Sequence, residues 1–296
     1  MNLYTHRDAN IRKTWFLFSL FFLIIIGFGY FLSHYFNSQE ILIVAVLFSV
    51  VMSFVSYWFS DKVVLSMAGA HPVTRENARE LYNIVENLSI TAGLPVPKIY
   101  LINDPSPNAF ATGRNPKNAV VAVTAGLLER LDRSELEGVI AHELSHIGNW
   151  DILLSTVVVI LVGFVALASD LFLRSIFWGG GRSRDDNNGG NGLMLVIGLI
   201  LMILAPIAAV LIQLAISRKR EFLADASGAL LTRYPEGLAS ALKKISQAPA
   251  VQSAKNTTAH LWFDDPFGPK QKTPWFHKLF MTHPPVEERI KALLGK

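Results

Sequence analysis

The sequence contains no cysteine. Disulfides, thiolate metal ligands and a cysteine nucleophile are therefore excluded, although this absence leaves the redox compartment undetermined. Charged side chains are also scarce: Asp, Glu, Lys and Arg make up 17% of the 296 residues, whereas soluble domains have about 25%. This scarcity indicates a membrane protein.

Four segments have almost no charge. Residues 14–39, 41–60 and 193–217 contain no Asp, Glu, Lys or Arg, and residues 152–173 contain only Asp170. Each run is about as long as the roughly 20 residues that a helix needs to cross a bilayer, and a helix satisfies its own backbone hydrogen bonds in lipid. We therefore predict four transmembrane helices. The first run is too long for a signal peptide and has no evident small-residue cleavage site.

These runs divide the chain into membrane and soluble parts. The predicted order is a basic N-terminal segment (1–13), two helices (14–60), a soluble part (61–151), two further helices (152–217) joined by a flexible loop (174–192), and a second soluble part (218–296). The link between the first two helices has no Lys or Arg, so the positive-inside bias places the soluble parts in the cytoplasm. Arg182 and Arg184 in the loop oppose that bias if both later helices cross fully, and a shallow hairpin is the alternative.

The net charge of +4 does not predict a nucleic-acid partner. Several Lys and Arg residues lie at the ends of the apolar runs, where they hold membrane helices in place. A groove for single-stranded nucleic acid would need Lys and Arg interleaved with aromatic residues. The expected partner is the lipid bilayer, and no nucleic acid.

The first soluble part predicts helices beside a small sheet. Thr74 can cap a helix that runs to about Thr91 and ends at Gly93. Three short β-branched or extended segments follow, at 98–102, 108–113 and 119–124. The fold class is therefore mainly α with a small β-sheet.

A further helix is predicted after residue 133. Ser134 and Glu137 have the spacing of a capping box, in which each side chain satisfies the other's free backbone N–H. Apolar residues recur at helical spacing at Leu136, Val139, Ile140, Leu144 and Ile147.

This helix carries the string His142-Glu143-Leu144-Ser145-His146. Positions four apart share one helix face, so both imidazoles can bind one zinc ion at about 2.0–2.1 Å. Glu143 points past the ion and can take a proton from the metal-activated water, whose pKa zinc lowers to roughly 7. A random shuffle gives the string about once in a hundred chains. The alternative is a solvated polar helix face.

A catalytic zinc needs a third protein ligand and one open position. Glu221 is the best candidate, and Asp225, four residues on, could accept the second ring N–H of a zinc-bound histidine. The alternative is that Glu221 and Asp225 are exposed acids that form ion pairs with the neighbouring Arg and Lys residues. Two predicted spans separate His146 from Glu221, so both lie at the same membrane surface.

The string HELSH, followed two spans later by SRKREFLAD, resembles the HtpX-type membrane zinc endopeptidases, relatives of the eukaryotic prenyl-protein protease. The resemblance covers nearly the whole chain. It implies a zincin-like domain with one Zn²⁺ per subunit on His142, His146 and Glu221, and Glu143 as the catalytic residue. It also implies a bacterial inner membrane, an active site facing the cytoplasm, and quality control of membrane proteins or unfolded polypeptides.

The resemblance assigns further roles. Residues Asn108, Ala109, Phe110, Ala111 and Thr112 would be an edge strand that pairs with the substrate backbone; an ordinary loop is the alternative.

The terminal pattern adds His283 and Arg289, which could stabilise an oxyanion. The alternative, which the sequence supports equally, is that His283 begins a helix and that Arg289 is exposed to solvent. His260 and His277 have no partner pattern and are interpreted as structural.

Two other functions remain open. A zinc-binding relative without catalysis would not need Glu143. A site-two type protease also uses this motif, but within a span, whereas residues 149–151 separate it from the third span here.

Overall fold

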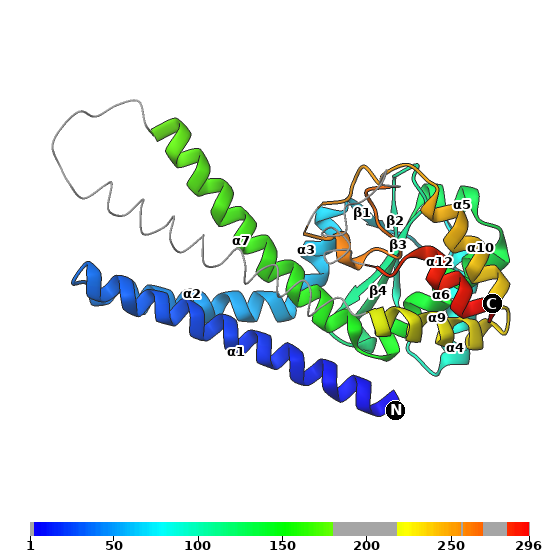
Figure 1. The fold of residues 1–296 in the computed structure, drawn as a ribbon, viewed down its shortest axis with the longest axis horizontal. Helices are drawn as coiled ribbons and strands as arrows, with labels where there is room; N and C mark the ends of the chain where they lie inside the picture. The colour runs from blue at the N-terminus through cyan, green and yellow to red at the C-terminus, as the bar shows by residue number, and fades with distance from the viewer. Residues whose placement is uncertain (1–2, 180–217, 256, 269–282, 296) are drawn as a thin grey trace.

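Among the residues that the structure describes, the long helices of the N-terminal half and the centre of the chain project from a globular part built around a small β-sheet (Figure 1). The computed structural model describes residues 3–179, 218–255, 257–268 and 283–295. Within these ranges the protein is mainly helical with one mixed sheet, which confirms the predicted fold class. The globular part comprises 60–150 and the described residues of 218–295.

The first two projecting helices are α1 (Leu3–Tyr35) and α2 (Gln39–Trp58), which run side by side (Figure 1). Both are long and apolar enough to cross a membrane, α1 over Asp8–Tyr35 and α2 over its whole length. Large apolar side chains on them are exposed, as at Leu23. Residues 3–13, predicted as a separate basic segment, are the first turns of α1.

The third projecting helix, α7 (Asp151–Gly179), follows α6 (Arg133–Gly148) after a sharp bend. The axis of α6 and that of Asp151–Ala166 differ by 82°, and Trp150 at the bend has a φ of 60°. The described residues contain two candidate spans, or three if the bent pair is one span. The predicted fourth span, 193–217, lies outside the described residues.

Near its end, α7 carries Asp170, which pairs with exposed Arg174 at 2.8 Å. This is an ordinary helix-surface ion pair. The loop predicted at 174–192 lies outside the described residues from 180 onward.

The sheet has four strands in the order β1-β2-β4-β3. They are β1 (Ala70–Pro72), β2 (Lys98–Ile102), β3 (Ala109–Gly113) and β4 (Ala119–Thr124). The parallel pair β2–β4 lies between two antiparallel pairs. The predicted bounds of β2 and β4 are confirmed, whereas β1 was missed, because three residues ending in proline carry little strand signal.

Strand β3 lies at the end of the strand order, and a later segment covers part of its outer side. Phe110 forms a bridge with Trp262, and the Phe263 N–H donates to the Ala109 carbonyl at 2.8 Å. A short 3-10 helix, η2 (Ala259–Leu261), precedes this contact.

The remaining helices surround the sheet. They are α3 (Ser60–Met67), α4 (Arg79–Ala92), η1 (Pro116–Asn118), α5 (Ala125–Arg130), α9 (Arg218–Thr232), α10 (Pro235–Ser246) and α12 (Val286–Leu294). α10 and α12 match the predicted helices within one residue.

Two predicted helix starts are wrong. α4 begins at Arg79, because the Thr74 carbonyl accepts N–H bonds from residues 77 and 78 in a turn. The cap of α6 is Asp132 rather than Ser134: its carboxylate accepts from the Glu135 N–H at 3.0 Å, and the Glu135 carboxylate accepts from the Asp132 N–H at 2.9 Å. Aspartate outcompetes the neighbouring serine for the free N–H groups, and Ser134 donates to it instead.

α6 is buried between its neighbours because two glycines permit close approach. A Cβ at Gly138 would lie 2.9 Å from the backbone of Leu238 on α10. A Cβ at Gly228 on α9 would lie 3.0 Å from the backbone nitrogen of His142. α9 therefore packs directly on the turn of α6 that carries His142.

Candidate metal centre

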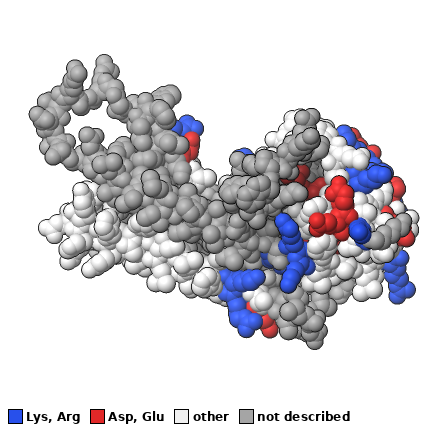
Figure 2. All heavy atoms as spheres, viewed as in Figure 1, with Lys and Arg blue, Asp and Glu red and all other residues white. Residues whose placement is uncertain are grey.

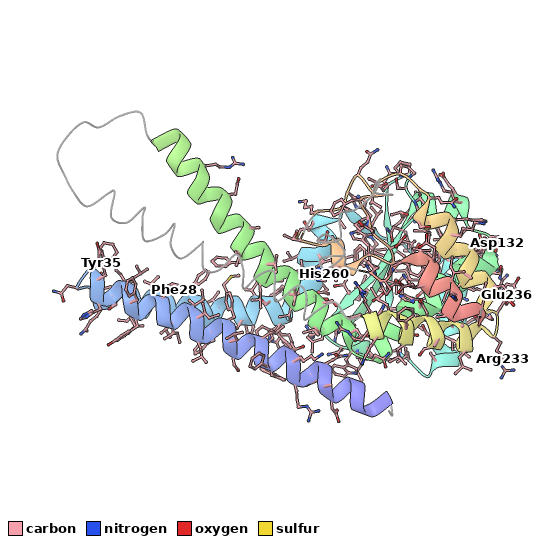
Figure 3. The ribbon with its side chains drawn as sticks, viewed as in Figure 1. Phe28, Tyr35, Asp132, Arg233, Glu236 and His260 are labelled. Carbon is pink, nitrogen blue, oxygen red and sulfur yellow. The ribbon has the colours of Figure 1, made fainter. Side chains whose placement is uncertain are left out.

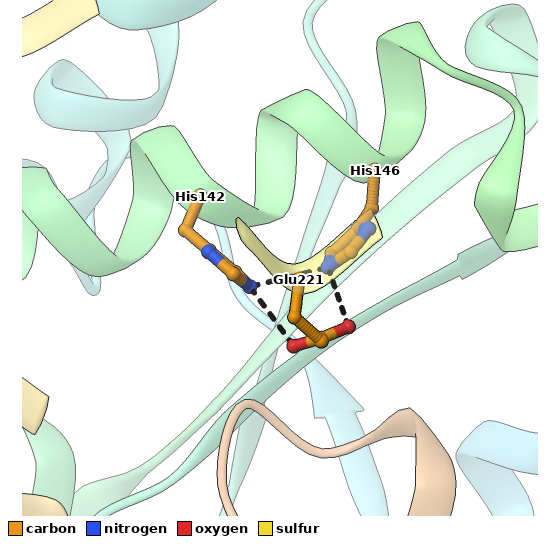
Figure 4. Close-up of side chains that lie close together, drawn as sticks. All are labelled: His142, His146 and Glu221. Atoms are coloured by element: carbon orange, nitrogen blue, oxygen red, sulfur yellow. Dashed lines mark hydrogen bonds and ion pairs between the residues drawn. The ribbon is translucent and has the colours of Figure 1, made fainter. Parts of the chain in front are cut away.

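Three side chains from two helices converge at the junction of α6 and α9 (Figure 4). His142 and His146 lie one turn apart on α6, and Glu221 lies in the first turn of α9. Their ligand atoms all lie within 4.8 Å of one another. The two Nε2 atoms are 3.1 Å apart, and the Glu221 carboxylate oxygens lie 3.8 Å from His142 Nε2 and 3.6 Å from His146 Nε2.

A carboxylate behind each ring fixes its tautomer. Asp225 lies 2.9 Å from Nδ1 of His142, and Asp151 lies 3.0 Å from Nδ1 of His146. Ionised carboxylates only accept hydrogen bonds, so each Nδ1 carries the proton. In the neutral form of each ring, the Nε2 lone pair then points at the other Nε2 and at Glu221. Such a set of facing acceptors fits a cation between them, and two imidazoles with one carboxylate are a ligand set of catalytic zinc.

Burial and the close approach of these charged groups shift their pKa values. Burial lowers the pKa of His142 to about 4, although Asp225 opposes the shift. Burial alone would also lower the pKa of His146, but Asp151 and Glu221 outweigh it and raise the value to about 9. Burial opposes ionisation of Glu221, yet nearby positive groups hold its pKa well below the usual value.

Arg289 is fully buried, with 0% exposure, and is not the solvated arginine of the alternative interpretation. Its guanidinium donates to both Asp225 oxygens, at 2.8 and 2.6 Å, and to the Phe263 carbonyl at 3.1 Å. This bidentate pair locks Asp225 behind His142.

The carboxylate behind His146 was missed by the sequence analysis. Asp151 is the first residue of α7, and its other oxygen accepts from Asn10 at 2.7 Å and from Arg220 at 3.2 Å. A carboxylate five residues after the second histidine was the only local signal. Its partners lie 141 and 69 residues away.

Glu143 is 2% exposed and borders the same cavity as the three converging side chains. Burial raises the pKa of Glu143 to about 7, and the nearby His146 ring opposes this shift. A carboxylate with a pKa near neutrality suits proton transfer at physiological pH.

Two further buried histidines line the cavity, His260 and His283. His283 Nδ1 lies 3.1 Å from the Glu221 carboxylate, while its Nε2 has no hydrogen-bond partner among the described residues. His260 faces the projecting helices (Figure 3), with Nε2 3.1 Å from the Ser155 carbonyl on α7. Burial lowers the pKa of His260 to about 4, so the ring is neutral and donates through Nε2 to that carbonyl. His277 lies outside the described residues.

Most residues of the predicted substrate strand, 108–112, are bonded to other parts of the chain. The Asn108 side chain donates to the Asp264 carbonyl, Ala109 and Phe110 pair with 262–263, and Thr112 bonds to Thr156 on α7. Only Ala111 of this segment lines the cavity.

Comparison with known proteins identifies the family of the chain. The sequence model of peptidase family M48 matches residues 75–296. A protein named "Protease HtpX homolog" from Caldanaerobacter subterraneus subsp. tengcongensis is 49% identical over 295 residues, which are 98% of this chain and 97% of that protein. Another so named, from Tropheryma whipplei (strain Twist), is 47% identical over 292 residues, with 98% and 97% covered.

Among solved structures, that of S. mikatae Ste24p has a TM-score of 0.48 at 21% identity, covering 95% of this chain and 66% of that chain. A likeness at this level supports no functional argument.

The apolar helices and the His-Glu cluster, together with these relatives, define a membrane metallopeptidase. The chain belongs to peptidase family M48.

Proposed function

We propose that the protein is a zinc endopeptidase that hydrolyses peptide bonds of membrane proteins and unfolded polypeptides. His142, His146 and Glu221 would hold one zinc ion per subunit. The observation that carries this proposal is that the three donors and the buried carboxylate of Glu143 border one cavity. When bound there, zinc supplies a Lewis acid that lowers the pKa of water and polarises a carbonyl.

Glu143 acts as the general base and acid. Its position next to the first histidine turns the carboxylate toward the cavity, where it accepts a proton from the attacking water and returns it to the leaving amine. His283 holds Glu221 through Nδ1, and in its doubly protonated form Nε2–H donates to the developing oxyanion. Arg289 would act indirectly. It hydrogen-bonds to Asp225, which positions the His142 ring, and it does not line the cavity itself.

Replacement of Glu143 separates catalysis from metal binding. We expect Glu143→Gln to lower the rate of cleavage of an unfolded membrane protein by about 10²–10⁴-fold, the usual worth of a general base, with zinc content unchanged. The matched control is Glu137→Gln, on the exposed face of the same helix. Cleavage by Glu143→Gln at the control rate would contradict the assigned role.

Substrate would bind as an extended chain beside Ala111. Residues two apart in a strand face the same side, and Ala109 and Gly113 both hydrogen-bond on the outer side of β3, to Phe263 and Thr156. The Ala111 N–H and C=O therefore face outward as well. The Ala111 carbonyl would then accept from a substrate N–H. This narrows the predicted edge strand of 108–112 to one pairing residue.

N-methylation of a peptide substrate tests this pairing. We expect methylation of the one amide that donates to Ala111 to reduce kcat/KM about tenfold, because a net hydrogen bond is worth about 1 kcal/mol. Methylation of the next amide, which points away from the strand, is the control. A scan in which every methylated peptide is cleaved equally well would rule out backbone pairing.

The cavity would lie at the cytoplasmic side of a bacterial inner membrane, where it serves quality control. On the visible face, most Lys and Arg lie over the globular part and its junction with the helices, and none lies along the far lengths of α1 and α2 (Figure 2). Farther out, α7 carries the exposed pair of Arg174 and Asp170. At the end of α2 nearest the globular part, Arg114 lies 4.3 Å from the Trp58 ring. Basic residues at this end favour the cytoplasmic side, and an aromatic ring favours a membrane–water interface on either side.

Single cysteines can report the orientation, because the chain has none of its own. We expect Asn37→Cys, in the turn between α1 and α2, to react with an impermeant maleimide in intact spheroplasts. Lys98→Cys, exposed on β2, should react only after permeabilisation. The reverse labelling pattern would place the active site outside.

A further inference from the structure

The hydrogen bonds behind His146 extend to the first helix of the chain. Asp151 uses Oδ2 for His146 Nδ1, at 3.0 Å. Its Oδ1 accepts from Asn10 Nδ2 at 2.7 Å and from Arg220 at 3.2 Å. Since Asp151 is 4% exposed, these donors rather than water satisfy its negative charge.

Asn10 is built into this position. It is 3% exposed, and its amide also donates to the Asn149 carbonyl at 3.0 Å. One side chain thus bonds both ends of the short bend between α6 and α7. The residue lies within the first candidate span, Asp8–Tyr35, and outside the 75–296 matched by the family.

Packing fixes α1 at this place. About two to three turns beyond Asn10, the buried side chains of Leu17, Phe18 and Phe21 form a cluster with those of α7, including Leu154 and Val158. Asn10 is therefore held against Asp151 by a continuous apolar contact and not by its two hydrogen bonds alone.

We infer that α1 is part of the metal centre, and that Asn10 is a positioning residue for His146 acting through Asp151. This inference rests on the zinc site of the proposed function. Partners of metal-binding histidines fix the ring orientation and raise its basicity, and their loss typically costs 10–100-fold in metal affinity. The first helix thus orients a zinc ligand as well as anchoring the chain in the membrane.

The test is zinc affinity of the full-length protein in detergent, measured by competition with a chromophoric chelator. Asn10→Leu removes both donors at similar volume, and we expect it to weaken zinc binding about tenfold. The matched control is Thr14→Val. Thr14 is 1% exposed on the same helix face, and among the described residues its hydroxyl donates to the Asn10 carbonyl of its own helix. This control should bind zinc as the wild type does.

A double-mutant cycle separates positioning from general packing. If Asn10 acts through Asp151, then Asn10→Leu should have no further effect on zinc affinity in the Asp151→Asn background. A purely structural role would produce the same loss in both backgrounds, and that result would overturn the inference. If Asn10→Leu does not fold, as judged by circular dichroism, Asn10→Ser replaces it in the cycle with a smaller expected loss.

The two proposals fail in different ways. Wild-type zinc affinity in Asn10→Leu would overturn the positioning role while leaving the zinc site intact. A wild-type protein that binds no zinc would overturn the proposed function and this inference with it.

Discussion

The structure depends on two imidazole nitrogens held 3.1 Å apart, Nε2 of His142 and Nε2 of His146. This contact is stable when one Nε2 carries a proton or when a cation lies between the two lone pairs. A buried carboxylate behind each ring enforces the arrangement, and each carboxylate has its own cation, Arg289 for Asp225 and Arg220 for Asp151. A site with so many buried charges is stable only if every one is paired.

The fold brings these groups together from distant parts of the chain. Close approach at Gly228 presses α9 on α6, so Glu221 reaches the histidines. α12 contributes Arg289 and packs on α9, while the bend at Trp150 sends α7 away and leaves Asp151 at the site. Residues at the start of α7 line the cavity, and α1 packs on α7. The cavity therefore lies where these two helices meet the globular part (Figure 1).

The sequence predicted the features that local spacing determines. His142, His146 and Glu143 follow from helical periodicity, and Glu221 with Asp225 follows from a second pair spaced four apart. The start of α6 was misplaced by two residues because Asp132, Ser134, Glu135 and Glu137 offer two overlapping capping patterns. Asn10 and Asp151 could not be linked from sequence, since their bond spans 141 residues and requires the tertiary packing of α1 on α7. His260 was interpreted as structural, and its ring bonds to a backbone carbonyl on α7; its place at the cavity also depends on tertiary packing.

The most direct test of the account is the zinc content of purified wild-type protein beside Glu221→Ala, with Glu236→Ala, an exposed glutamate on α10, as the control. The account predicts one zinc per chain in the wild type and the control, and loss of zinc in Glu221→Ala alone. Full zinc content in Glu221→Ala would mean that the carboxylate from α9 is not a ligand, which contradicts the convergence of α6 and α9 on one ion.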